Sequence, residues 1–323
     1  METATKPDTQ PVHGIVLLDK PLGLSSNAAL QRVRRLYGRP TAGHTGSLDP
    51  LATGMLPICL GEATKIAGLL LGGRKAYETQ IALGRRTSTG DAEGEVVEEA
   101  PVPALTRVEV EARLARLVGP QLQTPPMFSA VHVGGKRLYE LARLGMEVDR
   151  PARQIEILAL DLRQFATDRL TLSVVCTTGT YIRTLAEDVA KALGTVGHVA
   201  RLHRLWVEPF QTAPMHTLEA LERIAASGAG ALAQLVLPLE QALAGTPDIH
   251  LDAEAARRLA QGQRVPAEGD PGLKAVYGPM RHLLGLAELS ADGSLNARRL
   301  FTWAIDSKAC VQPNAVERDP SGR

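Results

Sequence analysis

The chain has 323 residues, 44% of them hydrophobic and 22% charged, which suits about two globular domains and excludes a wholly disordered protein. Its 36 Lys and Arg nearly balance 35 Asp and Glu, for a net charge of +1. Cys59, Cys176 and Cys310 are too few and too far apart for a disulfide framework or a cysteine-based zinc site. No apolar run approaches the ~20 residues of a membrane span, and the N-terminus lacks the features of a signal peptide. We therefore expect a cytoplasmic protein.

The first elements can be predicted from short-range patterns. Residues 1–11 are polar, and we expect them to be disordered. Gly14–Asp19 is a continuous apolar run, which is typical of a buried strand. Apolar residues at helical spacing then predict a helix that is capped by Ser26 or Asn27 and ends at Gly38.

The middle of the chain alternates between clear and irregular patterns. Thr106 and Glu109 form a capping box at the start of a helix. Residues 119–153 contain proline and glycine pairs and are expected to be an irregular insertion. Leu170–Cys176 alternates like a strand, and a helix is expected between Thr180 and Gly194.

The residue pattern changes near residue 249, from helical segments to short strand-like segments. Residues 217–243 are rich in Ala and Leu and predict helix, as does Ala253–Ala260. The following segments are short, strand-like and separated by Gly and Pro, which suggests a small β-barrel as a second domain: 274–277, 282–289 and 299–301. The tail from residue 307 is expected to be disordered.

Charge is distributed unevenly along the chain. Residues 20–86 hold ten Lys and Arg against three Asp and Glu, whereas residues 91–111 hold seven acids against one Arg. A basic segment of this kind suits a nucleic-acid backbone, and it equally suits an ordinary solvated surface.

Asp49 is the first candidate for chemistry. It is the only carboxylate between Asp19 and Glu62, among five Lys and Arg, so its anionic form should be favoured. Pro50 restricts its backbone, and nearby glycines allow a ligand to approach closely. The alternative is a simple Asp-Pro turn.

Other chemistries find little support in the sequence. The segment 38–45 has the spacing of a phosphate-binding P-loop, but His44 stands where that loop needs lysine. The motifs H-E-x-x-H and G-x-S-x-G are absent from the sequence, so we expect neither a metal centre nor a serine hydrolase.

The string GHTGSLDPLATGMLPICLGEATK, residues 43–65, resembles the catalytic motif of the TruB family of bacterial tRNA pseudouridine synthases. Five more segments resemble family motifs in the family's order: 17–38, 75–94, 125–145, 179–189 and 198–210. The likeness covers about residues 13–210, and residues 249–303 resemble, more diffusely, a PUA domain, which is a small RNA-binding barrel.

The resemblance implies an α+β protein in two domains. The first, residues 12–246, would have the pseudouridine-synthase fold, a mixed and mainly antiparallel sheet with flanking helices. An insertion at about 124–153 would grip the RNA. The second domain, residues 247–306, would be a PUA-like RNA-binding β-barrel, followed by a disordered tail over 307–323.

The resemblance also implies an activity, the isomerisation of uridine-55 in the T loop of tRNA to pseudouridine. This reaction needs no cofactor and no metal, and the family works on tRNA as monomers without an obligatory protein partner or a membrane. An alternative is a tRNA-binding folding helper in which catalysis is incidental. The guide-RNA relatives of archaea and eukaryotes are a third option, which the bacterial-type sequence of residues 124–153 disfavours.

Three positions match the catalytic residues of the family. Asp49 matches the essential aspartate, and Arg183 matches the arginine that pairs with it. Tyr77 matches the tyrosine that stacks on the target base.

Further positions match residues that bind the substrate. His44 matches the histidine that fills the space left by the flipped uridine, and Tyr181 matches a tyrosine of the pocket. Lys20 matches a lysine near the pocket, and Leu205 matches a leucine that packs against uracil, although core packing explains Leu205 equally well.

The insertion supplies the remaining expectations. Lys136 and Arg137 are assigned to phosphate contacts with the T loop, with surface solubility as the alternative. Four residues depart from the usual pattern and affect the expected RNA contacts rather than the reaction: Phe128, His132, His203 and Glu208.

Overall fold

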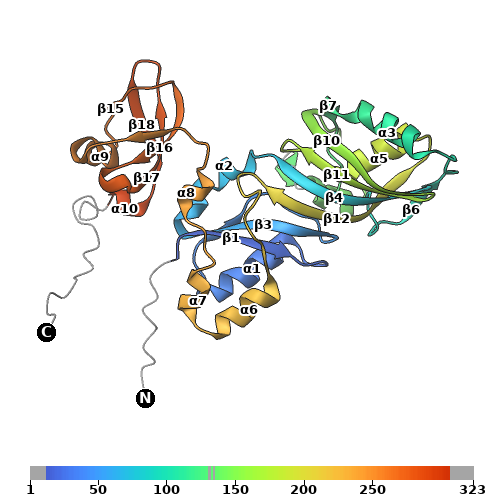
Figure 1. The fold of residues 1–323 in the computed structure, drawn as a ribbon, viewed down its shortest axis with the longest axis horizontal. Helices are drawn as coiled ribbons and strands as arrows, with labels where there is room; N and C mark the ends of the chain where they lie inside the picture. Colours follow the sequence, from blue (N-terminus) through green and yellow to red (C-terminus); the bar gives the residue numbers. More distant parts are fainter. Residues whose placement is uncertain (1–11, 130–131, 134, 306–323) are drawn as a thin grey trace.

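The computed structural model describes residues 12–129, 132–133 and 135–305, and both ends expected to be disordered lie outside this part. A nine-stranded sheet forms the body of the molecule (Figure 1). Its order is β13-β1-β3-β12-β4-β11-β10-β7, and β2 pairs with β3. The strands are β1 (Gly14–Lys20), β2 (Ala42–His44), β3 (Ala52–Leu60), β4 (Lys75–Leu83), β7 (Gly119–Gln123), β10 (Arg153–Ala166), β11 (Arg169–Cys176), β12 (Gly197–Val207) and β13 (His216–Thr217).

Most pairs of strands in this sheet are antiparallel. The parallel pairs are β1 with β13 and, at the centre, β3 with β12. The expected α+β class and the mixed, mainly antiparallel sheet are therefore confirmed.

Helices cover the sheet in two groups (Figure 1). Near β1 and β3 lie α1 (Ser26–Leu36), α6 (Leu218–Ala226) and α7 (Ala229–Ala233). Near β4, β11 and β10 lie α3 (Arg107–Leu114) and α5 (Ile182–Ala192). Short elements complete this part: η1 (Gly61–Ile66), α2 (Ala67–Leu71), η2 (Ala115–Leu117), α4 (Leu138–Arg143), α8 (Leu239–Ala242), and the two-stranded pairs β5 (Arg85–Thr87) with β6 (Val96–Glu99) and β8 (His132–Val133) with β9 (Lys136–Arg137).

The strands β1 and β3 are buried on both faces, which explains why they read as continuous apolar runs. Val16, Leu18 and Ile58 face one core with α1 and α6. Ile15 and Leu17 face a second core, which the C-terminal part of the chain shares. The expected strand at Gly14–Asp19 is confirmed.

The C-terminal part is a five-stranded sheet in the order β14-β16-β17-β18-β15. Its elements are β14 (Asp248–His250), α9 (Ala253–Ala260), β15 (Val265–Pro266), β16 (Gly272–Tyr277), η3 (Pro279–Arg281), β17 (Leu283–Leu289), β18 (Ser294–Leu300) and α10 (Thr302–Ile305). Leu283, Leu286 and Phe301 pack in the same apolar cluster as Ile15 and Leu17 of β1. This packing joins the C-terminal sheet to the large sheet through one continuous core.

Three local predictions need correction. The cap of α1 is Ser25, because Ser26 is buried and its hydroxyl bonds the backbone of Leu48 instead. Gly119–Gln123 is the edge strand β7 rather than irregular chain, since it pairs with β10. The stretch 217–243, expected to be helical throughout, consists of α6, α7 and α8 with non-helical residues between them.

Other local predictions are confirmed. Both hydrogen bonds of the Thr106–Glu109 capping box are present at the start of α3. The helix expected before Gly194 is α5, and Gly194 follows its end at φ 85°. In the described part of the chain, none of the helices is long and apolar enough to cross a membrane.

Candidate active site

Asp49 lies on the loop between β2 and β3, and the surrounding chain fixes this loop from two sides. The Ser26 hydroxyl donates to the carbonyl oxygen of Leu48 at 2.9 Å and accepts from its N–H at 2.7 Å. Gly23 N–H donates to the carbonyl oxygen of Pro50 at 2.8 Å. The residues on both sides of Asp49 are thus held by hydrogen bonds.

Lys20 lies beneath this loop and is fully buried. Its Nζ donates to the carbonyl oxygens of Pro21 at 2.9 Å, Leu24 at 2.7 Å and Pro50 at 3.5 Å. Burial lowers the pKa of Lys20 to about 8, while the charges of Asp49 and Glu93 oppose the shift. Lys20 therefore supports the loop and contributes positive charge under Asp49.

Arg183, in the first turn of α5, pairs with Asp49. Its Nε lies 2.9 Å from Asp49 Oδ2. Nη1 donates to the carbonyl oxygen of Thr89 at 2.9 Å, and Nη2 donates to that of Phe128 at 2.6 Å. Only 6% of the Arg183 side chain is exposed, against 41% of that of Asp49. The arginine is a fixed support, and the carboxylate is the accessible partner.

A second carboxylate, Asp91, lies behind this pair and was missed by the sequence analysis. Its Oδ2 is 3.7 Å from Arg183 Nε, and its side chain is 5% exposed. Its Oδ1 accepts from the Thr89 hydroxyl at 2.6 Å and from Glu93 N–H at 3.1 Å. No local signal separates Asp91 from the other acids of the segment 91–111.

The positive charges of Arg183 and Lys20 do favour the Asp49 anion, as expected, but burial outweighs them. Burial raises the pKa of the Asp49 carboxyl, and the charge of Asp91 raises it further, whereas Arg183 and Lys20 oppose the rise. Counting neighbours along the sequence omitted Asp91, which the fold brings close, and it omitted the loss of water.

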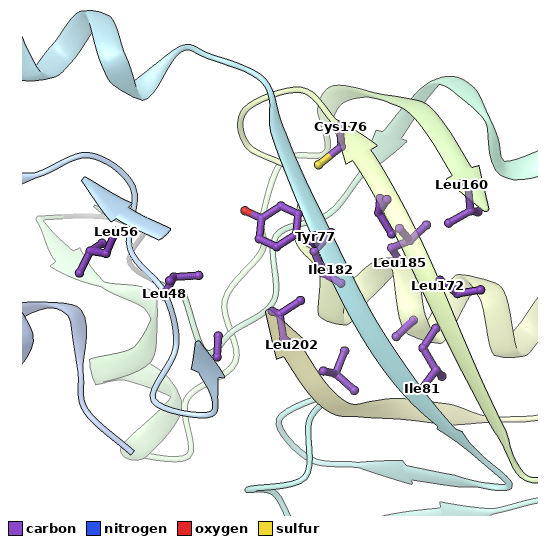
Figure 2. Packing of buried hydrophobic residues seen from close by; sticks show 14 of the residues in the cluster. Leu48, Leu56, Tyr77, Ile81, Leu160, Leu172, Cys176, Ile182, Leu185 and Leu202 are labelled. Carbon is purple, nitrogen blue, oxygen red and sulfur yellow. The ribbon is translucent and has the colours of Figure 1, made fainter. Parts of the chain in front are cut away.

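Tyr77 lies on β4 and is 7% exposed. Figure 2 shows its ring between β4 and the segment that carries Leu48, with Leu202 of β12 on a neighbouring side. Burial raises the pKa of Tyr77, and Arg204 opposes the rise. The buried ring can provide a flat wall for a planar ligand.

Arg204, the cross-strand neighbour of Tyr77, is a second residue that the sequence analysis missed. It is 1% exposed; its Nε donates to the carbonyl oxygen of Met55 at 2.7 Å, and Nη2 donates to that of Gly46 at 3.0 Å. Its alternation with Leu202 along β12 could have indicated a shared face. Arg204 joins the central strands to the loop that carries Asp49.

Two cavities meet at Asp49. The smaller cavity, of about 300 Å³, is lined by Tyr77, Tyr181, Leu202 and Arg204, among others. The larger cavity, of about 790 Å³, has His44 and Asp91 in its wall. Five residues line both cavities and form the boundary between them: Ser47, Leu48, Asp49, Ser129 and Arg183.

Most of the expected site residues gather here. His44 faces the larger cavity, its Nδ1 has no hydrogen-bond partner, and burial lowers its pKa. Tyr181 lines the smaller cavity, and its backbone exchanges two hydrogen bonds with the Gln123 side chain, at 2.7 and 3.1 Å.

Leu205 is not brought to either cavity. Its side chain is 38% exposed, and Leu202 and Arg204 line the smaller cavity from the same strand. The pairing of β12 with β4 shifts register between Arg204 and Trp206, so Leu205 is the extra residue at this irregularity. The side chains of Lys136 and Arg137, on β9, lie outside the described part of the molecule.

The residues that depart from the family pattern have identifiable contacts. Glu208 pairs with Arg74 at 2.7 Å, and His203 Nδ1 lies 2.8 Å from the Thr53 hydroxyl. Phe128 and His132 line the larger cavity. Within residues 12–129, 132–133 and 135–305, no group of three or more His, Cys, Asp and Glu has the arrangement of a metal site.

The arrangement suits chemistry on a ligand that bridges two cavities. An accessible carboxylate stands at the boundary, a buried guanidinium fixes its direction, and an aromatic wall lines the smaller side. A carboxylate held in this way can act as a nucleophile or as a general base.

Three family models match successive parts of the chain, and all three describe pseudouridylate synthases. The model of the TruB family pseudouridylate synthase N-terminal domain matches residues 34–182. Models of the tRNA pseudouridylate synthase B C-terminal domain and of the C-terminal region of pseudouridine synthase II TruB match residues 183–244 and 247–301.

Curated relatives match over nearly the whole chain. The tRNA pseudouridine synthase B of Xanthomonas campestris pv. campestris (strain B100) is 50% identical over 302 residues, which are 93% of this chain and 98% of the relative. The protein of the same name from Nitrosococcus oceani is 48% identical over 294 residues, covering 90% and 96%.

Solved structures share the fold. The matching chain of a Cbf5-Nop10-Gar1 complex has a TM-score of 0.73 at 20% identity and covers 96% of this chain and 93% of that chain. The archaeal box H/ACA sRNP Nop10-Cbf5 complex gives a TM-score of 0.70, also at 20% identity, with coverage of 95% and 92%.

Proposed function

The chain belongs to the TruB family of pseudouridylate synthases, and from this membership we propose that it isomerises uridine-55 in the T loop of tRNA to pseudouridine. The observation that carries the proposal is the Asp49–Arg183 ion pair at the boundary of two cavities. A carboxylate there can face the sugar of a nucleotide whose base enters one cavity while its backbone stays in the other.

The reaction rearranges one nucleotide without gain or loss of atoms. The bond from uracil N1 to the ribose C1′ breaks, the base turns, and C5 bonds to C1′. The hydrogen on C5 is lost to solvent as a proton, and N1 gains one. The Asp49 carboxylate starts the sequence by attack on the nucleotide or by removal of a ribose proton.

The other residues serve this step. Arg183 orients the carboxylate of Asp49 and opposes its protonation, because a guanidinium favours the anion. Tyr77 stacks on the base in the smaller cavity. His44, which burial keeps neutral, fills the space that the flipped uridine leaves and offsets part of a flipping cost of a few kcal/mol.

The proposal also assigns RNA-binding surface outside the two cavities. Residues 12–246 form the catalytic domain in this proposal, and residues 247–306 form the PUA-like domain that binds RNA. Lys136 and Arg137 contact phosphates of the T loop. The protein acts in the cytoplasm as a monomer, without cofactor or obligatory protein partner, and phosphate contacts make its tRNA binding weaker as salt rises.

The test uses an unmodified tRNA transcript with tritium at uridine C5, in EDTA and without added cofactor. We expect one equivalent of tritium to be released, with pseudouridine mapped to position 55 and no release by an Asp49→Asn variant. The variant should still bind the transcript. Tight binding without release by the wild-type protein would overturn the proposal and favour the folding helper. Release that requires a guide RNA would favour the guide-RNA relatives.

A further inference from the structure

Ser129 is an unusual residue of the site because its hydroxyl is buried without a partner. The residue is 6% exposed, and its Oγ has no hydrogen bond. A buried hydroxyl without a partner is costly, so it points to a ligand that completes it. Its position is informative as well, because Ser129 is one of the residues that line both cavities.

The backbone around Ser129 is fixed, so its hydroxyl is held ready. Ser129 N–H donates to the carbonyl oxygen of Met127 at 2.9 Å, and its own carbonyl accepts from Tyr139 N–H at 3.1 Å. The preceding carbonyl, of Phe128, accepts from Arg183 Nη2 at 2.6 Å. These backbone hydrogen bonds therefore fix the position of Ser129 relative to the Asp49–Arg183 pair.

The other polar residues of the boundary do not share this property. Asp49 and Arg183 bond each other. Ser47 is exposed and can be satisfied by water. Within the described part of the chain, the boundary thus offers one buried, unpartnered hydroxyl to whatever crosses it.

We propose that Ser129 binds the ribose 2′-hydroxyl of the target nucleotide and so contributes to the choice of RNA over DNA at that position. The inference rests on the proposed function. A base in the smaller cavity and a backbone in the larger one place the ribose at the boundary. The 2′-hydroxyl is attached to the carbon next to C1′, where Asp49 acts. A serine hydroxyl both donates and accepts, as the 2′-hydroxyl does, so the two are complementary.

The test is a double-mutant cycle between protein and RNA. All binding is measured in an Asp49→Asn background, so that turnover does not disturb the equilibrium. The two proteins carry Ser129 or Ser129→Ala, and the two T-loop RNAs carry uridine or 2′-deoxyuridine at the target position. Removing the serine oxygen should weaken binding of the uridine RNA about two- to tenfold, as for one neutral hydrogen bond. It should leave binding of the deoxyuridine RNA unchanged.

Ser47→Ala in the same background is the matched control, since it removes a solvent-exposed hydroxyl from the same boundary. Its effect should be the same on both RNAs. If Ser129→Ala weakens the binding of both RNAs by equal factors, or changes the binding of neither RNA, then Ser129 does not contact the 2′-hydroxyl and the inference is overturned. A failure of the proposed function would be seen separately, as absent tritium release by the wild-type protein on uridine RNA.

Discussion

Ser26 and Leu48 are joined by two hydrogen bonds, one in each direction, at 2.7 and 2.9 Å. They connect the start of α1 to the residue that precedes Asp49. A single buried hydroxyl therefore satisfies both backbone groups of Leu48 and helps to fix the loop that carries Asp49.

Ser26→Ala should lower both the rate and the stability of the protein. The change leaves the buried N–H and carbonyl of Leu48 unpaired, at a cost of about 1–3 kcal/mol in the free energy of unfolding. A small shift of Asp49 should lower kcat about 10- to 100-fold. Single-turnover rates and denaturant unfolding measure the two effects.

Thr106→Ala is the matched control for that experiment. It removes the cap of α3, which lines neither cavity at Asp49, at about 1 kcal/mol. Its kcat should equal that of the wild-type protein. Equal losses of rate in the two variants would mean that general destabilisation, and not the loop, explains the effect of Ser26→Ala.

Asp91→Asn should shift the pH dependence of the reaction. The charge of Asp91 raises the pKa of Asp49, so its removal lowers that pKa. The proposed reaction requires the Asp49 carboxylate, so the acid limb of the kcat profile should move to lower pH. At neutral pH we expect kcat to fall about tenfold with KM unchanged, because Arg183 loses a counter-charge.

The asparagine keeps an oxygen for the bonds that Asp91 Oδ1 accepts from Thr89 and Glu93. A slower enzyme with an unmoved acid limb would contradict the electrostatic role and leave only a structural one.

Asp49 should destabilise the folded protein when it is ionised. Burial raises its pKa above the ordinary value of 3.8, so the folded state binds the proton more tightly than the unfolded chain. This loss of stability is absent below the pKa that Asp49 has in the unfolded chain. It is complete above the pKa that Asp49 has in the folded protein. Asp49→Asn should therefore raise Tm at neutral pH, and the difference from wild type should vanish as the pH falls through this window. Thermal unfolding measured from acid to neutral pH gives this difference in Tm. A variant less stable than the wild type at neutral pH would contradict the prediction.

Gly54 cannot carry a side chain. Its φ is 99°, and a Cβ would collide with the backbone of Arg204 on β12. Gly54→Ala should lower the free energy of unfolding by about 2 kcal/mol or more. Gly68→Ala is the control, since Gly68 lies in α2 with open space around it, and it should stabilise the protein by about 0.5–1 kcal/mol. Equal effects in urea titrations would contradict the steric argument.

The sequence allowed prediction of elements whose signals are local. The Thr106–Glu109 box, the end of α5 at Gly194 and the apolar run of β1 depend on a few adjacent residues. The strand β10 was missed because its register shifts twice against β11, near Ile157 and Leu162, which interrupts the alternation.

The site was predictable only in part for the same reason. Asp49, Tyr77 and Arg183 stand in recognisable motifs, and the fold brings them to neighbouring cavity walls. Asp91 and Arg204 act through partners distant in sequence, and only Arg204 has a local signal, its alternation with Leu202. The pKa of Asp49 depends on burial and on Asp91, and both exist only after folding.

The continuous core that joins β1 to Leu283, Leu286 and Phe301 fixes the C-terminal sheet relative to the large sheet. The strand β1 also leads to Lys20, beneath the Asp49 loop. The C-terminal sheet cannot tilt relative to that loop without opening packed apolar surface. Any ligand that touched both the C-terminal sheet and Asp49 would therefore have to span one fixed separation.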